Sequence, residues 1–375
     1  MKKIGLFILA IAVLSFVSSS CRHGKTPDQI RVAKYKPMAD ADGNHYGTTT
    51  LNLSPSKSTT PVPTGVSFTN EVMTEDLRTG ATADGSLSKD ASGLLIVGCF
   101  NNNKANCDTL GALYSAEKAI GQSLDQLAVA TTTSGDANGD GFDDASVKAA
   151  LIAAGYDPNI YTITPLYDLA NGFTGTTVND TLPAGGYQSP KGLIVGSSSK
   201  TITYAINQKT GDTVYTPGAG LQPNGQPKIL VPDLSKINFT TILPVATTVK
   251  GSCPDGWHIP SDGEWKILEM ALGMTAVDVN KEGIENDRGS NEGIGPKLAA
   301  QLQLKYAGYI DTSGASAQLG EVEAMWTSTG GKDQFGSYIW IRYIDLMAHK
   351  NKGVIRKKQY LLKSGFSIRC FKDTK

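Results

Sequence analysis

The chain has no excess of either charge and few of the residues that do metal or redox chemistry. Its 375 residues hold 35 Lys and Arg against 35 Asp and Glu, with only 4 His and 5 Cys. Because the charges balance, no net field attracts nucleic acid, and we expect no nucleic-acid partner. The HExxH, GxSxG and GxxxxGK[ST] motifs are missing, which argues against metalloprotease, serine hydrolase and nucleotide-hydrolysing activities. We therefore expect a protein that is not an enzyme.

Long apolar runs are also missing, except at the N-terminus. Lys2 and Lys3 precede an apolar or small run at residues 4–17, then three Ser and Cys21. That run is short for a bilayer span, which needs roughly 20 residues, but it suits the hydrophobic core of a signal peptide. Small residues followed by Cys are typical of lipoprotein processing. We predict that residues 1–20 are removed and that Cys21 carries acyl chains such as palmitate; the alternative is ordinary secretion.

Lipidation would make a membrane the first partner of this protein. Several acyl chains on one terminus suffice for stable anchoring. We expect the outer membrane, and the sequence leaves open whether the domain faces the surface or the periplasm. The residues after Cys21 lack the acidic cluster that often marks surface export in Bacteroidetes-like lipoproteins.

Four further cysteines remain: Cys99, Cys107, Cys253 and Cys370. An even number in an exported chain favours two disulfides, for which three pairings exist. The spacings lack the paired CxxC knuckles of a zinc site, so zinc is disfavoured.

The amino-acid composition differs between the segments of the rest of the chain. Residues 21–62 hold few large apolar side chains and are predicted to be a flexible tether. Residues 63–375 are predicted to be one domain of short strands with one or two helices, the clearest beginning at Ser261, where Glu264 completes a capping box. Residues 122–245 are Thr- and Gly-rich, and we interpret them as an insertion holding a helix near 145–154 and a hairpin within 201–215.

Several segments resemble one family. CPDGWHIPSDGEW at 253–265, MWTST at 325–329 and GFSIRC at 365–370 are similar to signatures of the Fibrobacter succinogenes major paralogous domain. VMTEDL at 72–77 and CFNNN through GALY at 99–114 resemble its N-terminal half. The resemblance implies an exported lipoprotein with an α+β, C-type-lectin-like fold, here with a large inserted subdomain. It also supports Cys99–Cys107 and Cys253–Cys370 pairing and structural roles for His258 and the tryptophans of the first signature.

One segment has the spacing of a calcium-binding loop. Its side-chain oxygens and one carbonyl fall at positions 1, 3, 5, 7 and 9, in Asp136, Asn138, Asp140, Phe142 and Asp144. Position 12 should be Glu or Asp but is Val147. We expect modest, structural calcium binding; the alternative is a solvated turn whose acidic residues favour the start of the next helix.

These features together favour a non-catalytic recognition role at the envelope, adhesin-like, with a glycan or a protein as ligand. The alternative is a structural or assembly component of a surface fibre or envelope complex. Trp340 is not followed by the Asn-Asp pair of calcium-dependent lectins, and Gln222-Pro223-Asn224 lies in the inserted region. Aromatic residues at Trp326, Tyr338, Trp340 and Tyr343 could stack on a sugar, although alternating aromatics in strands are more often core.

Overall fold

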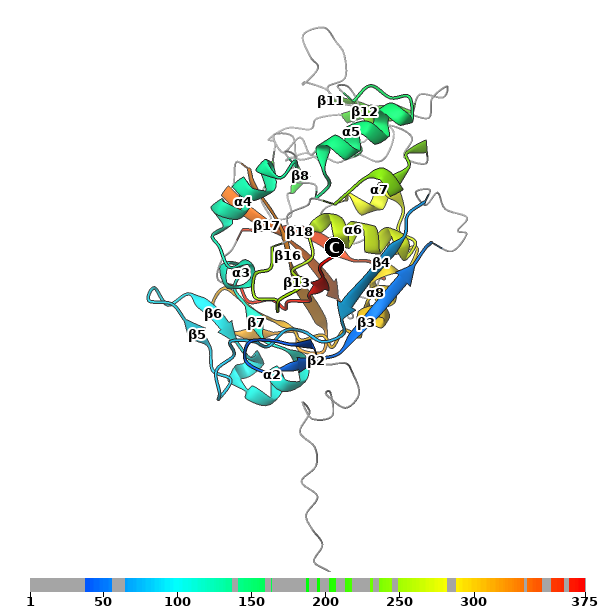
Figure 1. Cartoon of the computed structure of the whole chain (residues 1–375). Helices are drawn as coiled ribbons and strands as arrows, with labels where there is room; N and C mark the ends of the chain where they lie inside the picture. The colour runs from blue at the N-terminus through cyan, green and yellow to red at the C-terminus, as the bar shows by residue number, and fades with distance from the viewer. Residues whose placement is uncertain are drawn as a thin grey trace, which may run out of the picture.

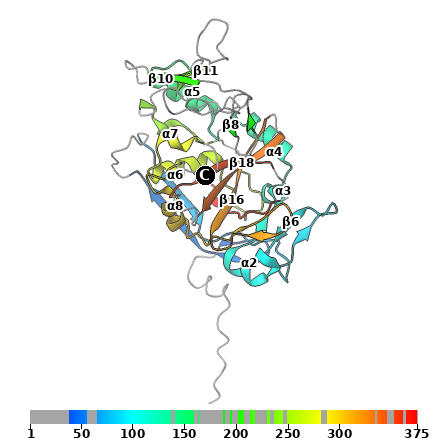
Figure 2. The same cartoon turned by 180° about the vertical axis from the view of Figure 1, so that it is seen from behind.

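The computed structural model describes residues 38–55, 65–136, 141–158, 163, 236–244, 249–281, 288–333, 336–345, 352–360 and 364–374, with five short strands between 187 and 231. Helices and small sheets alternate in an α+β fold, as predicted (Figures 1 and 2). The described α-helices are more than the one or two expected: α2 (Lys104–Leu110), α3 (Ala116–Ile120), α4 (Leu124–Thr133), α5 (Asp144–Ala153), α6 (Asp262–Ala271), α7 (Ala276–Val279) and α8 (Ile294–Leu302).

Two sheets form the centre of the domain. One has the strand order β13-β19-β4-β3 and contains β3 (Thr48–Leu53), β4 (Phe68–Met73), β13 (Trp257–His258) and β19 (Phe371–Lys372). The other contains β16 (Val322–Asp333), β17 (Gly336–Asp345) and β18 (Ile355–Gln359), all antiparallel. Because Phe371 pairs with Val72, the end of the chain lies against one of its first strands.

Smaller sheets surround these two. They are formed by β1 (Met38–Ala39) with β2 (His45–Tyr46); β5 (Ser88–Lys89), β6 (Leu95–Gly98) and β7 (Leu113–Tyr114); and β14 (Tyr309–Ile310) with β15 (Ser316–Ala317). The inserted segment contributes β8 (Tyr187–Gln188), β9 (Ile194–Val195), β10 (Ile202–Ile206), β11 (Thr213–Pro217) and β12 (Leu230–Val231). The predicted hairpin is present, since Ile206 pairs with Thr213 in β10 and β11. The predicted inserted helix is α5.

The described part of the segment predicted to be a tether is folded. Strand β3 pairs along its whole length with β4, and Tyr46 and Leu51 are buried. The prediction failed because this segment is polar and rich in Thr, so its strand has only a few buried side chains to reveal it. Thr is nevertheless a good strand former on a half-buried surface. The domain therefore begins before residue 63.

Helix α6 begins and packs as its sequence predicts. Ser261 caps the backbone N–H of Glu264, whose side chain accepts from the Ser261 N–H, so both halves of the capping box are present. Trp265 and Leu268 on its inner face are fully buried. Trp265 contacts Phe371 at 5.4 Å between ring centroids, which joins the helix to the last strand.

Two disulfides hold distant parts of this framework. Cys99 is bonded to Cys107 across the turn that starts α2, and Cys253 is bonded to Cys370. The second bond joins positions 117 apart in the sequence and ties the segment before α6 to the last strand. All four cysteines are buried.

A pair of acids lies buried near the first strands. Arg369 Nη2 lies 2.7 Å from Asp76 Oδ1, and Glu323 accepts from the Ala307 N–H. Burial raises the pKa of Glu323 well above its ordinary value, and the neighbouring Asp76 raises it further. Burial also raises the pKa of Asp76, although its ion pair with Arg369 acts in the opposite direction.

Candidate functional site

A surface hollow between helix α4 and strands β16 and β17 is a candidate site. We name it the α4–β17 groove; its volume is about 350 Å³ and it is lined by Asp125, Ala128, Val129, Thr132, Thr133, Asp136, Gly330, Gly331, Lys332 and Tyr338. Helix α4 presents buried residues at helical spacing, namely Leu124, Leu127, Ala128 and Thr131, to the sheet. Its other face forms one wall of the groove.

Two glycines let the helix and the aromatic wall approach each other. An added Cβ at Gly330 would lie 2.8 Å from Leu127 Cδ2, and one at Gly331 would lie 2.4 Å from the Tyr338 hydroxyl. Both distances are shorter than real Cβ contacts, so neither position accepts a side chain without movement. The Gly330 N–H also donates to Thr131 Oγ1 at 3.2 Å, which fixes α4 on β16.

The charges of the groove are largely paired. Asp125 lies 3.6 Å from Lys332 Nζ and accepts from the Ser337 hydroxyl. This hydrogen bond and the charge of Lys332 hold the pKa of Asp125 below its ordinary value. At the other end, the buried Asp136 accepts from the Gly141 N–H at 2.8 Å. The lining therefore carries two carboxylates against one ammonium group, which is paired with Asp125.

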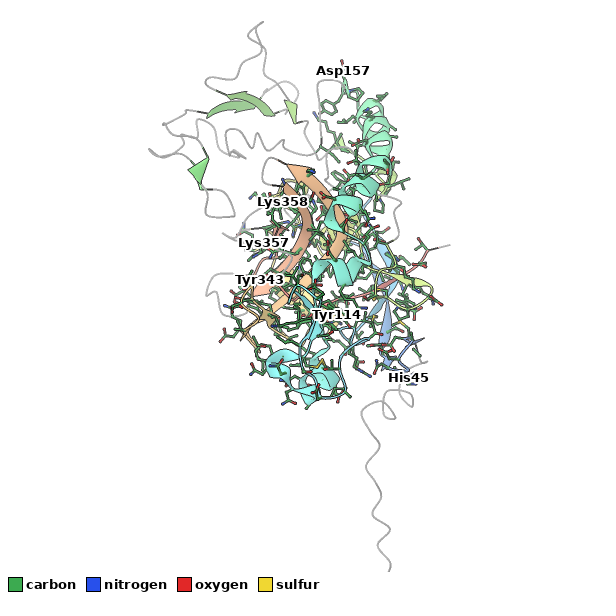
Figure 3. All side chains as sticks on the ribbon, turned by 90° about the vertical axis from the view of Figure 1, so that its left-hand side faces the viewer. His45, Tyr114, Asp157, Tyr343, Lys357 and Lys358 are labelled. Carbon is green, nitrogen blue, oxygen red and sulfur yellow. A yellow bond between two sulfur atoms is a disulfide. The ribbon has the colours of Figure 1, made fainter. Side chains whose placement is uncertain are left out.

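A stack of aromatic and cationic side chains supports Tyr338. Its ring lies 5.6 Å from the ring of Trp340 and 5.6 Å from that of Tyr360, and Lys358 Nζ lies 4.4 Å from its centroid. Figure 3 shows Lys357 and Lys358 beside one another above Tyr343. On the far side of Trp340, Arg356 lies over the indole at 3.4 Å. These contacts restrict the aromatic wall to one orientation.

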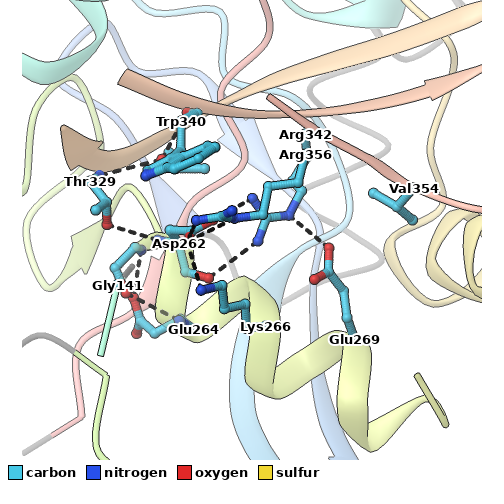
Figure 4. Close-up of polar contacts among 12 residues, drawn as sticks. Gly141, Asp262, Glu264, Lys266, Glu269, Thr329, Trp340, Arg342, Val354 and Arg356 are labelled. Carbon is cyan, nitrogen blue, oxygen red and sulfur yellow. Dashed lines mark hydrogen bonds and ion pairs between the residues drawn. The ribbon is translucent and has the colours of Figure 1, made fainter. Parts of the chain in front are cut away.

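Arg356 belongs to a buried charge network at the start of α6, which Figure 4 shows. Asp262 is its centre: Arg342 Nη1 lies 2.6 Å from Oδ1, Arg356 Nη2 lies 2.7 Å from Oδ2, and Lys266 Nζ lies 3.3 Å from Oδ2. Burial would raise the pKa of Asp262, but Arg356, Lys266 and Arg342 hold it well below its usual range. Asp262 therefore stays ionised as the shared partner of three cations.

Glu269 extends the network two turns further along α6. It accepts from Arg342 Nε at 2.7 Å and pairs with Arg288, which also donates to the Val279 carbonyl. Burial would raise the pKa of Glu269, yet the two arginines lower it. With their carboxylates engaged inside the fold, these charges hold α6 against β17 and β18 instead of meeting a ligand.

His258 is also engaged by its own domain. Its Nδ1 lies 2.7 Å from Asp373 Oδ1, its Nε2 lies 2.9 Å from Glu264 Oε1, and its side chain is buried. Burial lowers the pKa of His258, but the hydrogen bonds and charges of Glu264 and Asp373 outweigh it, so the pKa is raised. Its position between the α6 capping box and the end of the chain fits the predicted structural role.

This pairing predicts a loss of stability as pH rises. A His whose folded pKa lies above its unfolded value of 6.5 stabilises fully below pH 6.5, and that stability disappears as pH rises through the folded pKa. We expect urea unfolding midpoints to fall over this window in the parent, and His258→Gln to flatten that fall. His45→Gln, a matched control distant from Glu264 in the sequence, should keep the decline. An unchanged profile in His258→Gln would contradict the prediction.

The predicted calcium loop is only partly visible. Asp136 is buried, Phe142 is buried under Lys266, and Asp144 begins α5, whereas Asn138 and Asp140 lie outside the described residues. Asp143, the residue before Asp144, caps α5 by accepting from the Ser146 N–H. This fits the alternative interpretation, in which acidic residues of the turn favour the start of the next helix. Within the described ranges, no group of three His, Cys, Asp or Glu could hold a metal ion. Calcium binding by the whole loop stays a prediction.

Cys21 and Gln222-Pro223-Asn224 also lie outside the described residues. In the part of the chain that the structure does describe, no helix is long and apolar enough to cross a membrane. Trp326, within β16, is fully buried and donates from Nε1 to the Tyr114 carbonyl, so it belongs to the core. Of the four aromatic candidates, only Tyr338 lines the groove.

Sequence reasoning missed helix α4 and the charge network. Ser123 and Gln126 form a second capping box in front of α4, and this local signal was available. Arg342 stands in the middle of an otherwise apolar strand, which is a sign of a buried ion partner. Its partners Asp262 and Glu269 lie seven residues apart on α6, and their sequence context does not distinguish them from ordinary surface charges.

Comparison with known families agrees with this framework. The model of the Fibrobacter succinogenes major domain matches residues 73–372. The chain belongs to this family. Its match spans both disulfides, the α6 capping box and the whole inserted segment, so the insertion lies within one Fibrobacter succinogenes major domain. Neither a curated protein nor a solved structure matches the chain.

Proposed function

We propose that this Fibrobacter succinogenes major domain protein is anchored to the outer membrane through Cys21 and recognises a ligand there without transforming it. The observation that carries the proposal is the α4–β17 groove, a hollow already formed on a cross-linked framework. The strongest charges nearby are engaged within the fold, so the groove offers contacts rather than a reactive group. Preformed, rigid sites of this kind favour binding.

The position of the groove suits a protein anchored at its N-terminus. In Figure 1, β2 lies near the bottom of the domain and α4 lies higher, on its left side, so the groove beside α4 is separated from β2. A lipid on Cys21 would hold the part of the domain that carries β2 toward the membrane. The groove would then lie on a part of the domain away from β2, where a ligand in the surrounding space can reach it.

Replacing Cys21 by Ser tests the anchor. We expect the parent to fractionate with outer membranes and Cys21→Ser to appear in the soluble fraction or to accumulate as uncleaved precursor, because Ser cannot take a diacylglycerol thioether. Ser20→Ala keeps a small side chain before the cysteine and should behave like the parent. If Cys21→Ser fractionates and migrates like the parent, the anchor is wrong.

Ligand recognition needs a separate test. Protease treatment of intact cells reports which face carries the domain, and a glycan array with the purified protein reports whether it binds sugars. Binding to a glycan supports the recognition role. No binding on the array, together with stoichiometric co-purification of envelope proteins, would contradict the recognition role and support the assembly role.

A further inference from the structure

We infer that the α4–β17 groove binds a short, uncharged saccharide of one or two rings. The inference rests on the proposed recognition role and names the ligand class for it. The volume of about 350 Å³ lies at the lower end of the range of small-molecule sites. It has room for a ring or two and not for a protein segment with its own side chains.

The charges of the lining disfavour anionic and purely apolar ligands of this size. A phosphate or carboxylate would meet Asp125 and Asp136 with Lys332 as the single cation of the lining, and that cation already faces Asp125. A purely apolar ligand would cover the exposed side chains of Asp125 and Lys332 and leave them without water. A neutral ligand with many hydroxyl groups avoids both costs, because its hydroxyls donate to carboxylate oxygens and accept from Lys332.

The remaining lining suits the apolar faces of a sugar ring. Val129, which is 63% exposed, and Ala128 provide aliphatic surface, and Tyr338 adds the small exposed part of its otherwise buried aromatic ring. Thr132 and Thr133 donate their hydroxyls to carbonyls one turn back on α4, so they present mainly their methyl groups and one acceptor oxygen each. The groove thus offers a pyranose both apolar and polar contacts.

The aromatic wall is preorganised, which lowers the entropy cost of binding. Trp340, Tyr360 and Lys358 hold Tyr338 from behind, and Gly331 allows its hydroxyl end to lie over the backbone of β16. Trp340 is in turn fixed by Arg356 from the buried charge network. The network that stabilises α6 therefore also positions the wall of the groove.

A matched pair of Trp substitutions tests the inference. Thr132 and Thr109 are both exposed helical threonines whose hydroxyls donate to the carbonyl four residues earlier, but only Thr132 lines the groove. The probes are glucose, galactose, mannose, N-acetylglucosamine, cellobiose, lactose and chitobiose, added to the full protein in detergent and followed by saturation-transfer NMR and calorimetry. We expect at least one to bind the parent and Thr109→Trp alike.

In Thr132→Trp the indole fills the groove, and we expect affinity for the same sugar to fall about tenfold or more, a free-energy change of about 1.4 kcal/mol or more. Tyr338→Leu keeps an apolar side chain but removes the ring, and should weaken binding in the same direction. Equal thermal unfolding of the two Trp variants would show that folding is intact. Binding that survives Thr132→Trp, or no signal from any sugar, overturns the inference.

Spermidine is included as a cationic probe. If it binds and competes at the groove while every sugar is silent, the site takes amines and the inference is wrong. Binding of a sugar or of spermidine does not test the membrane anchor; the Cys21→Ser variant tests the anchor separately. Conversely, a parent protein that stays soluble would overturn membrane anchoring and leave saccharide binding measurable.

Discussion

Replacing Asp262 with Asn is expected to lower the free energy of unfolding by about 3–5 kcal/mol, the usual cost of removing one partner from a buried ion pair. Asn keeps the shape of the side chain and removes its charge. Arg342, Arg356 and Lys266 then lose the carboxylate that all three contact, inside a region without exposed surface. Urea unfolding followed by tryptophan fluorescence measures the loss.

Asp255→Asn is the matched control for this substitution. Asp255 pairs with Lys250 on the surface, where its side chain is 95% exposed, so water solvates either partner when the pair is broken. We expect an unfolding midpoint close to that of the parent. Equal midpoints for the two Asn variants would mean that the buried network does not stabilise the fold.

Removing the Cys253–Cys370 disulfide should destabilise the domain more than removing Cys99–Cys107. In the chain-entropy account, a cross-link between positions 117 apart contributes roughly 4–5 kcal/mol, and one between positions 8 apart roughly 2.5 kcal/mol. The long-range bond also joins the segment before α6 to the last strand, so its loss affects the central sheet. The short bond holds one turn before α2.

The test compares two double variants, Cys253→Ala with Cys370→Ala and Cys99→Ala with Cys107→Ala, so that no free thiol remains. Unfolding is followed without reductant, and peptide mapping of the parent verifies the pairing. A larger loss from the short-range pair, or a Cys99–Cys253 peptide in the parent, would contradict the expectation. The two variants serve as controls for each other because both replace two buried cysteines with Ala.

The charge network contacts the aromatic wall of the groove through Arg356. Arg356 contacts both Asp262 and the indole of Trp340, and Trp340 contacts Tyr338. A carboxylate at the start of α6 thus determines how an aromatic wall is held on β17. The cluster thus contacts the aromatic wall as well as α6, which apolar side chains of similar volume could not do in the same way.

Much of the local structure was predictable because its signals are local. The α6 capping box lies within four residues, and α5 and the β10–β11 hairpin follow short periodic patterns. The disulfide pairing and the family rested on resemblance, which carries long-range information that spacing alone does not. Strand β3 was missed because a single buried Leu51 and scattered threonines give no clear period.

The sequence by itself determined the signal-like N-terminus, the α+β class, the α6 cap and the membership in the Fibrobacter succinogenes major domain family. Only the tertiary structure decided which charges meet and where a groove forms. Asp262 and Arg342 are 80 residues apart, and α4 meets β17 across more than 200. Such contacts depend on how elements pack, because a buried ion pair and a hollow are properties of neighbouring surfaces and not of any one segment.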